Sequence, residues 1–142
     1  MTLHLIGIGL ADEKDISVKG FEAIKSCSKV YLENYTSLLQ CTKERLEKFY
    51  GRKIALANRH QAENNMQQIL DEAKIQNIAL LVIGDIFSAT THINYLLECK
   101  KQNIPIKIIH NASILTAVGE IGLELYKYGK VTSMPFIGSK TP

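Results

Sequence analysis

Cysteine is scarce in this sequence, and its spacing excludes two classes of small cross-linked domain. The cysteines are Cys27, Cys41 and Cys99, an odd number with no CxxC pair. Neither a disulfide framework nor a cysteine-rich zinc site has that pattern. We therefore expect three reduced thiols in a cytoplasmic protein. With 142 residues, 46% of them hydrophobic, the chain can bury one core without cross-links.

The sequence also lacks the marks of nucleic-acid-binding, membrane and metal-binding proteins. Its formal net charge is only +3 and its basic residues are scattered, so we expect no nucleic-acid partner. The N-terminal apolar run, 3–10, is short and follows no basic segment, so we expect neither a signal peptide nor a membrane partner. His60, His92 and His110 are far apart, with no HxxxH or HExxH pair, and we expect no metal site.

Short apolar runs alternate with helical patterns along the whole chain. The apolar runs predict five strands, at residues 3–8, 29–32, 54–57, 78–83 and 106–109. Helices are indicated after Ser17, at 42–50, 61–74 and 91–101, and after Ser113. This alternation predicts an α/β fold, a three-layer α/β/α arrangement around a mainly parallel five-stranded sheet.

The spacing of apolar residues within each helix predicts which side chains face the core. The first helix is expected to bury Val18, Phe21 and Ile24. The expected inward residues of 61–74 are Ala62, Met66, Ile69, Leu70 and Ala73, and those of 91–101 are Ile93, Leu96 and Leu97. Cys99 is expected to be a solvated or half-buried thiol, and His4 a packing histidine.

Ligands of open α/β sheets bind beyond the carboxyl ends of the strands, and three strand ends here carry suitable residues. The first is Gly7-Ile8-Gly9-Leu10, where glycine lets a ligand approach the backbone. The dinucleotide fingerprint needs a third glycine where Asp12 stands, which counts against a standard NAD site. The alternative is a tight turn with no ligand.

The second strand end, at 84–92, follows the most apolar strand and carries Asp85. An unpaired carboxylate is costly to bury, so Asp85 must have partners. Ribose hydroxyls or a ligand's ammonium group would be suitable partners, and the negative charge would offset a sulfonium. The alternative is that Asp85, or Thr90, caps the helix that follows.

The third strand end is His110-Asn111-Ala112-Ser113-Ile114. Exposed backbone groups and the Ser113 hydroxyl there would suit the edge of an adenine. The alternative is that Ser113 is a helix N-cap, and the spacing alone favours that role.

These segments together resemble the diphthine synthases, a branch of the tetrapyrrole-methylase-like methyltransferases. The resemblance lies in the order and spacing of motifs across nearly the whole chain. The motifs are Leu5-Ile6-Gly7-Ile8-Gly9-Leu10, Asp15-Ile16-Ser17-Val18-Lys19-Gly20, Tyr31-Leu32-Glu33-Asn34-Tyr35-Thr36-Ser37-Leu38, Gly84-Asp85 with Ala89-Thr90-Thr91-His92, His110-Asn111-Ala112-Ser113-Ile114, and the segments 117–119, 122–123 and 125–130.

The resemblance implies a function and a set of cofactor contacts. The implied activity is transfer of methyl groups from S-adenosylmethionine, leaving S-adenosylhomocysteine, to a modified histidine of translation elongation factor 2, in a homodimeric enzyme. Eukaryotic members are similar in adding a further methyl to a carboxylate. The implied cofactor contacts are Leu10, Asp85, Ser88, Ser113 and Ile114. We assign no catalytic residue from the sequence.

The sequence departs from the family pattern in two places and in its length. Ile86 stands where the family usually has proline, which is expected to relax the loop after Asp85. Glu120-Ile121 replaces a small or hydroxylic pair. Members of the family carry a second domain, so we expect residues 1–136 to be the cofactor-binding domain, 137–142 to begin a linker, and the chain to be part of a longer protein.

Two other functions are compatible with the sequence. A methylase of tetrapyrrole precursors would have the same fold, and the segments 35–37 and 90–92 argue against it. A non-catalytic docking or dimerisation module is favoured by Ile86 and the chain length. Polar residues retained at strand ends, such as Asp85 and Ser113, argue against a docking module. Titration with S-adenosylmethionine separates the docking module from the enzymes, and the methylated target, a protein of elongation-factor size or a tetrapyrrole, separates the two enzymes.

Overall fold

The computed structural model describes residues 1–34, 37–57, 59–88 and 91–132. Its centre is a sheet of five parallel strands in the order β3-β2-β4-β1-β5. The strands are β1 (Leu3–Gly7), β2 (Lys29–Glu33), β3 (Ile54–Ala57), β4 (Ile78–Val82) and β5 (Ile106–Ile109). The predicted α/β class and the parallel five-stranded sheet are confirmed.

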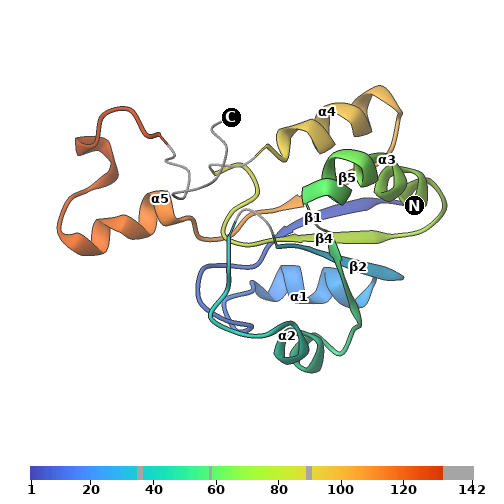
Figure 1. The fold of residues 1–142 in the computed structure, drawn as a ribbon, viewed down its shortest axis with the longest axis horizontal. Coiled ribbons are helices and arrows are strands. Elements are labelled where there is room, and N and C mark those ends of the chain that lie inside the picture. The colour runs from blue at the N-terminus through green and yellow to red at the C-terminus, as the bar shows by residue number, and fades with distance from the viewer. Residues whose placement is uncertain (35–36, 58, 89–90, 133–142) are drawn as a thin grey trace.

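Helices cover both faces of the sheet, giving three layers (Figure 1). One face carries α1 (Val18–Lys25) and α2 (Lys43–Tyr50), and the other carries α3 (Arg59–Ile75) and α4 (Ile93–Lys101). Each side has its own apolar core, and β4 contributes to both, with Leu80 in one cluster and Leu81 in the other. A strand buried on both faces explains why β4 is the most apolar run of the sequence.

The helix boundaries follow the capping residues that the sequence supplies. Ser17 accepts a hydrogen bond from the backbone N–H of Gly20, and Thr42 accepts one from that of Arg45. Gly51 ends α2 with a φ of 66°, in the left-handed region that glycine adopts without a steric penalty. These local signals place α1 and α2 where the sequence predicted them.

The inward faces of two helices differ from the predictions. Val18 is 75% exposed, because α1 brings Gly20 and Ile24 to the sheet instead. On α4, Ile93 and Leu97 are 45% and 55% exposed.

Tyr95 and Cys99, one turn apart, are the buried pair of α4. The prediction of a solvated or half-buried Cys99 is therefore wrong, because the thiol is fully buried. α4 carries apolar side chains around most of its circumference, so spacing alone cannot select the face that meets the sheet.

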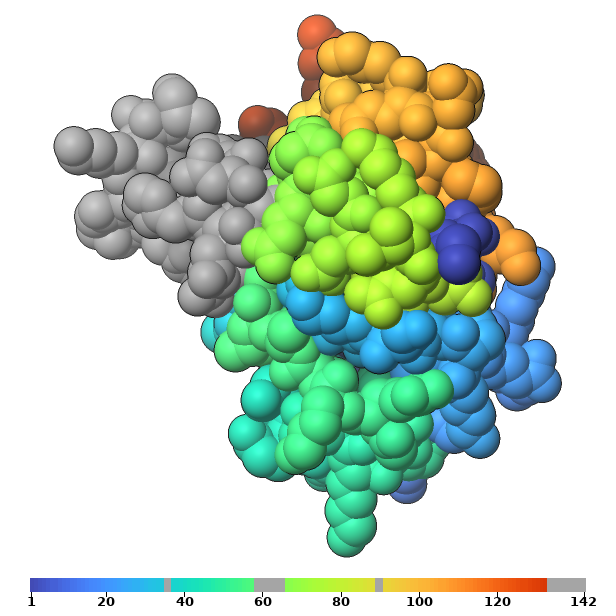
Figure 2. All heavy atoms as spheres, turned by 90° about the vertical axis from the view of Figure 1, so that its right-hand side faces the viewer, coloured from blue at the N-terminus to red at the C-terminus, as the bar shows by residue number. Residues whose placement is uncertain are grey.

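The two ends of the described chain lie in different surroundings. The N-terminus is held between the segments that lead into β4 and β5, as Figure 2 shows: the N–H of Leu3 donates to Pro105 and the carbonyl of Thr2 accepts from Ile78. Beyond β5, α5 (Ile114–Ala117) and the 3₁₀ turns η1 (Val118–Ile121) and η2 (Leu125–Lys127) run away from the sheet (Figure 1). Large exposed apolar residues of this C-terminal segment are Ile114, Ile121, Leu123, Leu125, Tyr126 and Val131.

None of the helices in the described part of the chain combines the length and hydrophobicity that crossing a bilayer requires. The expected domain boundary at 136–137 lies outside the described residues.

Candidate functional site

Three loops meet at Gly84, at the carboxyl edge of the sheet. Gly84 and Gly9 form an antiparallel bridge, with the Gly84 N–H donating to Gly9 at 2.7 Å and the Gly9 N–H donating back at 3.4 Å. A Cβ built on Gly84 would lie 3.7 Å from the Leu10 side chain and 3.8 Å from the carbonyl oxygen of Ala112. The loops after β1, β4 and β5 thus converge, because these strands are neighbours in the sheet.

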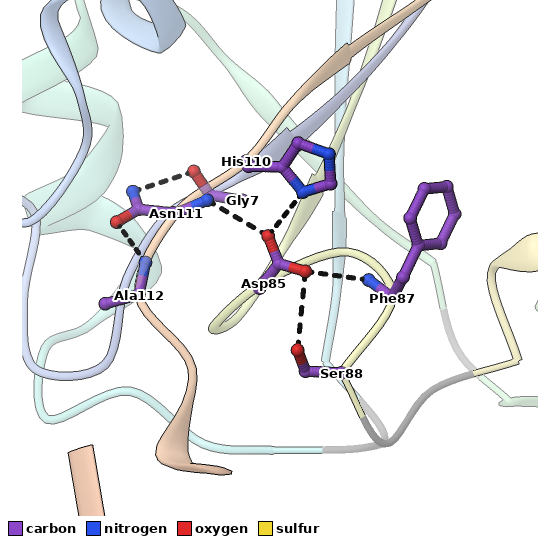
Figure 3. A network of polar contacts seen from close by, with 7 residues as sticks. All are labelled: Gly7, Asp85, Phe87, Ser88, His110, Asn111 and Ala112. Atoms are coloured by element: carbon purple, nitrogen blue, oxygen red, sulfur yellow. Dashed lines mark hydrogen bonds and ion pairs between the residues drawn. The ribbon is translucent and has the colours of Figure 1, made fainter. Parts of the chain in front are cut away.

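Asp85 connects the loops after β4 and β5 (Figure 3). One carboxylate oxygen, Oδ1, accepts from the N–H of Phe87 at 3.1 Å and from the Ser88 hydroxyl at 3.4 Å. The other, Oδ2, contacts Nδ1 of His110 at 2.8 Å and accepts from the N–H of Asn111 at 3.1 Å. A carboxylate has about four acceptor positions, so these donors account for its hydrogen-bonding capacity.

The surroundings of Asp85 keep its carboxyl group ionised. Burial by itself raises the pKa of Asp85, whose side chain is 10% exposed. The hydrogen bonds from Phe87, His110 and Asn111 outweigh burial and hold the pKa below its usual value. The loop edge therefore carries a fixed negative charge.

Asn111 joins the loop after β5 to β1. Its side-chain amide nitrogen donates to the carbonyl oxygens of Gly7 and Asp15, both at 3.0 Å. Its side-chain oxygen accepts from the N–H of Ala112 at 2.7 Å (Figure 3). One amide side chain thus bonds to the backbone of two segments, which ties β1 to the loop after β5.

The loop that carries Leu10 is fixed by two acidic side chains. Asp15 Oδ2 accepts from the N–H groups of Leu10 and Ala11, at 3.0 and 2.7 Å. Glu13, whose side chain is 6% exposed, pairs with Arg45 of α2 at 2.9 Å. Asp12, at the position of the missing third glycine, accepts from the N–H of Lys14 at 2.9 Å, a turn contact that requires no ligand.

The structure brings the predicted site residues to one edge of the sheet in two groups. Leu10, Asp85 and Ser88 lie around Gly84, as described above. Ser113 is buried and caps α5, accepting from the N–H of Leu115 at 3.1 Å, while Ile114 is 61% exposed. The capping role of Ser113 is therefore confirmed, and the side-chain hydroxyl already has one partner.

Asp85 does not cap the helix that follows. The N-cap of α4 is His92, which makes no capping bond with its side chain, and Asp85 instead closes the turn at Phe87 and Ser88. Thr90, the other predicted cap, lies outside the described residues. The loop is also anchored by Ile86, which is fully buried in the core beside α3 and α4.

A second buried polar pair links β2 to the start of α4. Nε2 of His92 lies 3.9 Å from Glu33, and both side chains are almost fully buried. Burial lowers the pKa of His92 although the Glu33 carboxylate opposes that shift, so the imidazole is held neutral. The His92 ring stacks on Tyr95 with its centroid 6.1 Å away.

His4 lies away from the candidate site. It lines a hollow of about 510 Å³ beside α1, together with Lys19 and Lys107. Burial and the nearby Lys107 lower the pKa of His4, so it is a neutral histidine in the packed sheet, as the sequence indicated. No group of three or more metal-ligating side chains occurs in the described part of the chain.

The sequence interpretation missed His110 and Asn111 as partners of Asp85. Both residues stand in the segment that was singled out for Ser113, but nothing in the spacing joins position 85 to position 110. The pairing of Asp85 with His110 can be inferred only once the strand order is known, because β4 and β5 flank β1. The polar loops that follow β4 and β5, on either side of β1, then become candidates for one network.

The chain matches the family model described as Tetrapyrrole (Corrin/Porphyrin) Methylases over residues 2–135. It is 53% identical over 134 residues to the diphthine methyl ester synthase of Homo sapiens, covering 94% of this chain and 47% of that protein. It is 50% identical over 143 residues to the enzyme of that name from Dictyostelium discoideum, covering 99% and 52%.

A solved structure described as a diphthine synthase superposes with a TM-score of 0.87 at 42% identity, covering 91% of this chain and 52% of that one. The resemblance expected from the sequence is confirmed, although the chain spans about half the length of the curated relatives it matches. Since the family match extends from residue 2 to residue 135, the chain belongs to the tetrapyrrole (corrin/porphyrin) methylase family.

Proposed function

We propose that this chain is the cofactor-binding part of a methyltransferase of the diphthine synthase type. The proposed protein transfers methyl groups from S-adenosylmethionine to the modified histidine of translation elongation factor 2. The convergence of three loops on Gly84, beside the ionised Asp85, carries the proposal. Relatives about half identical to this chain and named diphthine methyl ester synthase support the choice of substrate.

The charge and shape of the loop edge fit the proposed cofactor. S-adenosylmethionine has a sulfonium and an ammonium group, and the Asp85 carboxylate supplies the opposite charge. Gly84 has no side chain and a φ of 80°, and it is buried between Leu10 and Ala112, so the three loops pack closely beside Asp85. We propose that Leu10, Asp85, Ser88, Ser113 and Ile114 hold the cofactor.

Binding at Asp85 requires an exchange of hydrogen-bond donors. The two backbone donors, Phe87 and Asn111, belong to the loops themselves and cannot leave without unfolding them. The Ser88 hydroxyl is the longest contact, at 3.4 Å, and His110 has a side chain that is 65% exposed. We propose that a cofactor hydroxyl or ammonium group displaces the Ser88 hydroxyl first.

The cofactor supplies an electrophilic methyl group when it is bound, so the protein needs no nucleophile of its own. The loops hold the donor while the acceptor amine is aligned with the methyl–sulfur bond, at roughly 3 Å from the carbon. Such alignment lowers the activation free energy by several kcal/mol, on the order of 7 kcal/mol for well-oriented groups. A sheet edge whose loops are joined by hydrogen bonds suits this role.

The remaining parts of the proposal concern the protein's organisation. Residues 1–136 form the cofactor-binding domain and 137–142 begin the linker to a second domain, as in a two-domain relative. Because clefts between domains bury the most ligand surface, the isolated chain should bind S-adenosylhomocysteine weakly or not at all. Micromolar affinity of the isolated chain by calorimetry would contradict this division of the site.

A homodimer in the cytoplasm completes the proposal. Support for the dimer comes from the exposed apolar side chains of the C-terminal segment, such as Leu125 and Tyr126. Support for the location comes from three free cysteines. Sedimentation of the natural-length protein should show twice the mass of one chain, and a monomer at micromolar concentration would contradict the dimer.

The direct test of the function is a methyl-transfer assay with the natural-length protein. Elongation factor 2 carrying the unmethylated histidine extension should gain radioactivity from labelled S-adenosylmethionine, and a tetrapyrrole precursor should not. Labelling of the tetrapyrrole alone would establish the other enzyme class. Calorimetry showing no binding of S-adenosylmethionine would favour a docking module instead.

A further inference from the structure

Asp85 and His110 form a carboxylate–imidazole dyad at the candidate site. Nδ1 of His110 lies 2.8 Å from Asp85 Oδ2, while the imidazole side chain is 65% exposed and the carboxylate 10%. The edge of the Phe87 ring packs against the imidazole, with centroids 5.9 Å apart. Figure 3 shows the ring held between Asp85 and Phe87. One imidazole nitrogen is therefore fixed against a buried charge, and most of the ring faces outward.

This arrangement selects one tautomer of His110. An ionised carboxylate only accepts hydrogen bonds, so Nδ1 must carry the proton that it donates to Asp85. In the neutral ring Nε2 then has a free lone pair. In enzymes where a carboxylate orients a histidine through Nδ1, Nε2 acts as the general base.

The charged side chains near His110, other than Asp85, are directed elsewhere. Among the described residues, Asp85 is the charged group in contact with His110. Asp15, in the neighbouring loop, directs its carboxylate to the N–H groups of Leu10 and Ala11 instead. Lys107 is on β5, the strand that precedes His110, but it lines the hollow near His4.

We propose that His110 is the proton acceptor for the amine that is methylated, an inference that rests on the proposed function. The substrate ammonium gives a proton to Nε2 of His110, which frees the nitrogen lone pair. That lone pair forms the nitrogen–carbon bond as the carbon–sulfur bond breaks, and the bonding electrons return to sulfur. The imidazolium then releases its proton to water.

The test compares His110→Asn with the control Lys107→Asn in the natural-length protein. An asparagine amide can keep the donor to Asp85 but has no basic nitrogen. Lys107→Asn places the same new residue on β5, three positions away. Each variant is measured for S-adenosylhomocysteine affinity by calorimetry and for single-turnover methyl transfer between pH 6 and 10.

We expect His110→Asn to bind S-adenosylhomocysteine within threefold of the wild type. Its transfer rate at pH 7 should fall by roughly 10²- to 10⁴-fold, the range for loss of a general base. The loss should shrink towards pH 10, where the substrate amine deprotonates in water. Lys107→Asn should keep both properties. In nitrogen-detected NMR spectra of the wild type, His110 should show a protonated Nδ1 and an unprotonated Nε2.

Three results would overturn the proposal. The first is His110→Asn transferring methyl within threefold of the wild type at pH 7. The second is a parallel loss of S-adenosylhomocysteine affinity, which would make His110 a positioning residue for Asp85. The third is the opposite tautomer by NMR. A wild-type protein that binds no S-adenosylhomocysteine fails at the earlier step and overturns the proposed function together with the role of His110.

Discussion

The side-chain nitrogen of Asn111 lies 3.0 Å from the carbonyl oxygen of Gly7, and this contact joins the tips of β5 and β1. The closeness is possible because Gly7 has no side chain. A Cβ built there would lie 2.7 Å from the carbonyl oxygen of Gly84 and 2.9 Å from Cβ of Asn111. The packing of all three loops therefore depends on a single missing methyl group.

Gly7→Ala is expected to destabilise the protein by about 1–3 kcal/mol, the usual cost of forcing extra atoms into a packed region. The neighbours at this position are backbone and Cβ atoms, which cannot swing aside. Urea unfolding measures the change, and Gly119→Ala is the control, since nothing lies within 4 Å of a Cβ there. Equal stability of the two variants would show that the loop packing is looser than described.

Asp85→Asn is expected to lower the free energy of unfolding by about 1–3 kcal/mol at pH 7, because four hydrogen-bond donors lose their charged acceptor. The pKa of Asp85 is lowered in the folded state, so its ionisation stabilises the fold above the unfolded-state pKa of about 3.9. That contribution disappears as pH falls through the folded-state pKa.

The stability difference between wild type and Asp85→Asn should therefore be constant near pH 7 and shrink below about pH 4. Chemical unfolding at several pH values measures it, and subtraction cancels the other carboxylates. Asp71→Asn, at a residue whose side chain is 57% exposed, serves as the control and should show a much smaller difference. A difference independent of pH down to the acid transition would contradict the ionised Asp85.

Arg45→Ala is expected to destabilise the loop after β1. The Arg45 side chain is 54% exposed, which limits the value of the pair, but its partner Glu13 is 6% exposed and would lose its counter-charge. Thermal unfolding measures the change. Lys127→Ala removes a partner of Glu124 where both side chains are about half exposed, and should be neutral. Equal effects of the two substitutions would mean that the burial of Glu13 is unimportant.

Cys41 is expected to be the thiol that reacts first with an aromatic disulfide reagent at pH 7.5. Cys41 is partly exposed, whereas Cys27 and Cys99 are buried. Burial raises the pKa of Cys99 to about 11, so its thiolate fraction is very small at this pH. Absorbance should report one thiol in the native protein and three after urea is added. The reaction of native protein should vanish in Cys41→Ser, and a persisting fast phase would contradict the assigned burial.

The strands could be predicted from the sequence because a parallel sheet covered on both faces demands continuous apolar runs. Residues 78–83 illustrate this, since β4 is buried along its whole length. The helix ends were equally local, as Ser17 and Gly51 show. By contrast, Leu97 and Cys99 of α4 could not be sorted from spacing, because the sheet and not the helix decides which face is covered.

The candidate site was only half readable from the sequence. Asp85 could be selected because a carboxylate after a buried strand needs partners. Its partners His110 and Asn111 stand in the loop after β5, 25 and 26 residues later in the chain, and the pairing depends on β1 lying between β4 and β5. Strand order arises from long-range packing, which no local pattern encodes.

The position of β1 between β4 and β5 has a consequence for biosynthesis. The ribosome releases β1 long before its two neighbours in the sheet, β4 and β5, because both lie much later in the chain. Until then its apolar side chains are exposed to solvent, where a chaperone can bind them. Slow translation before β4 should therefore lengthen the time for which β1 is unpaired and exposed. The sheet can form only after β4 and β5 have been made and have paired with β1.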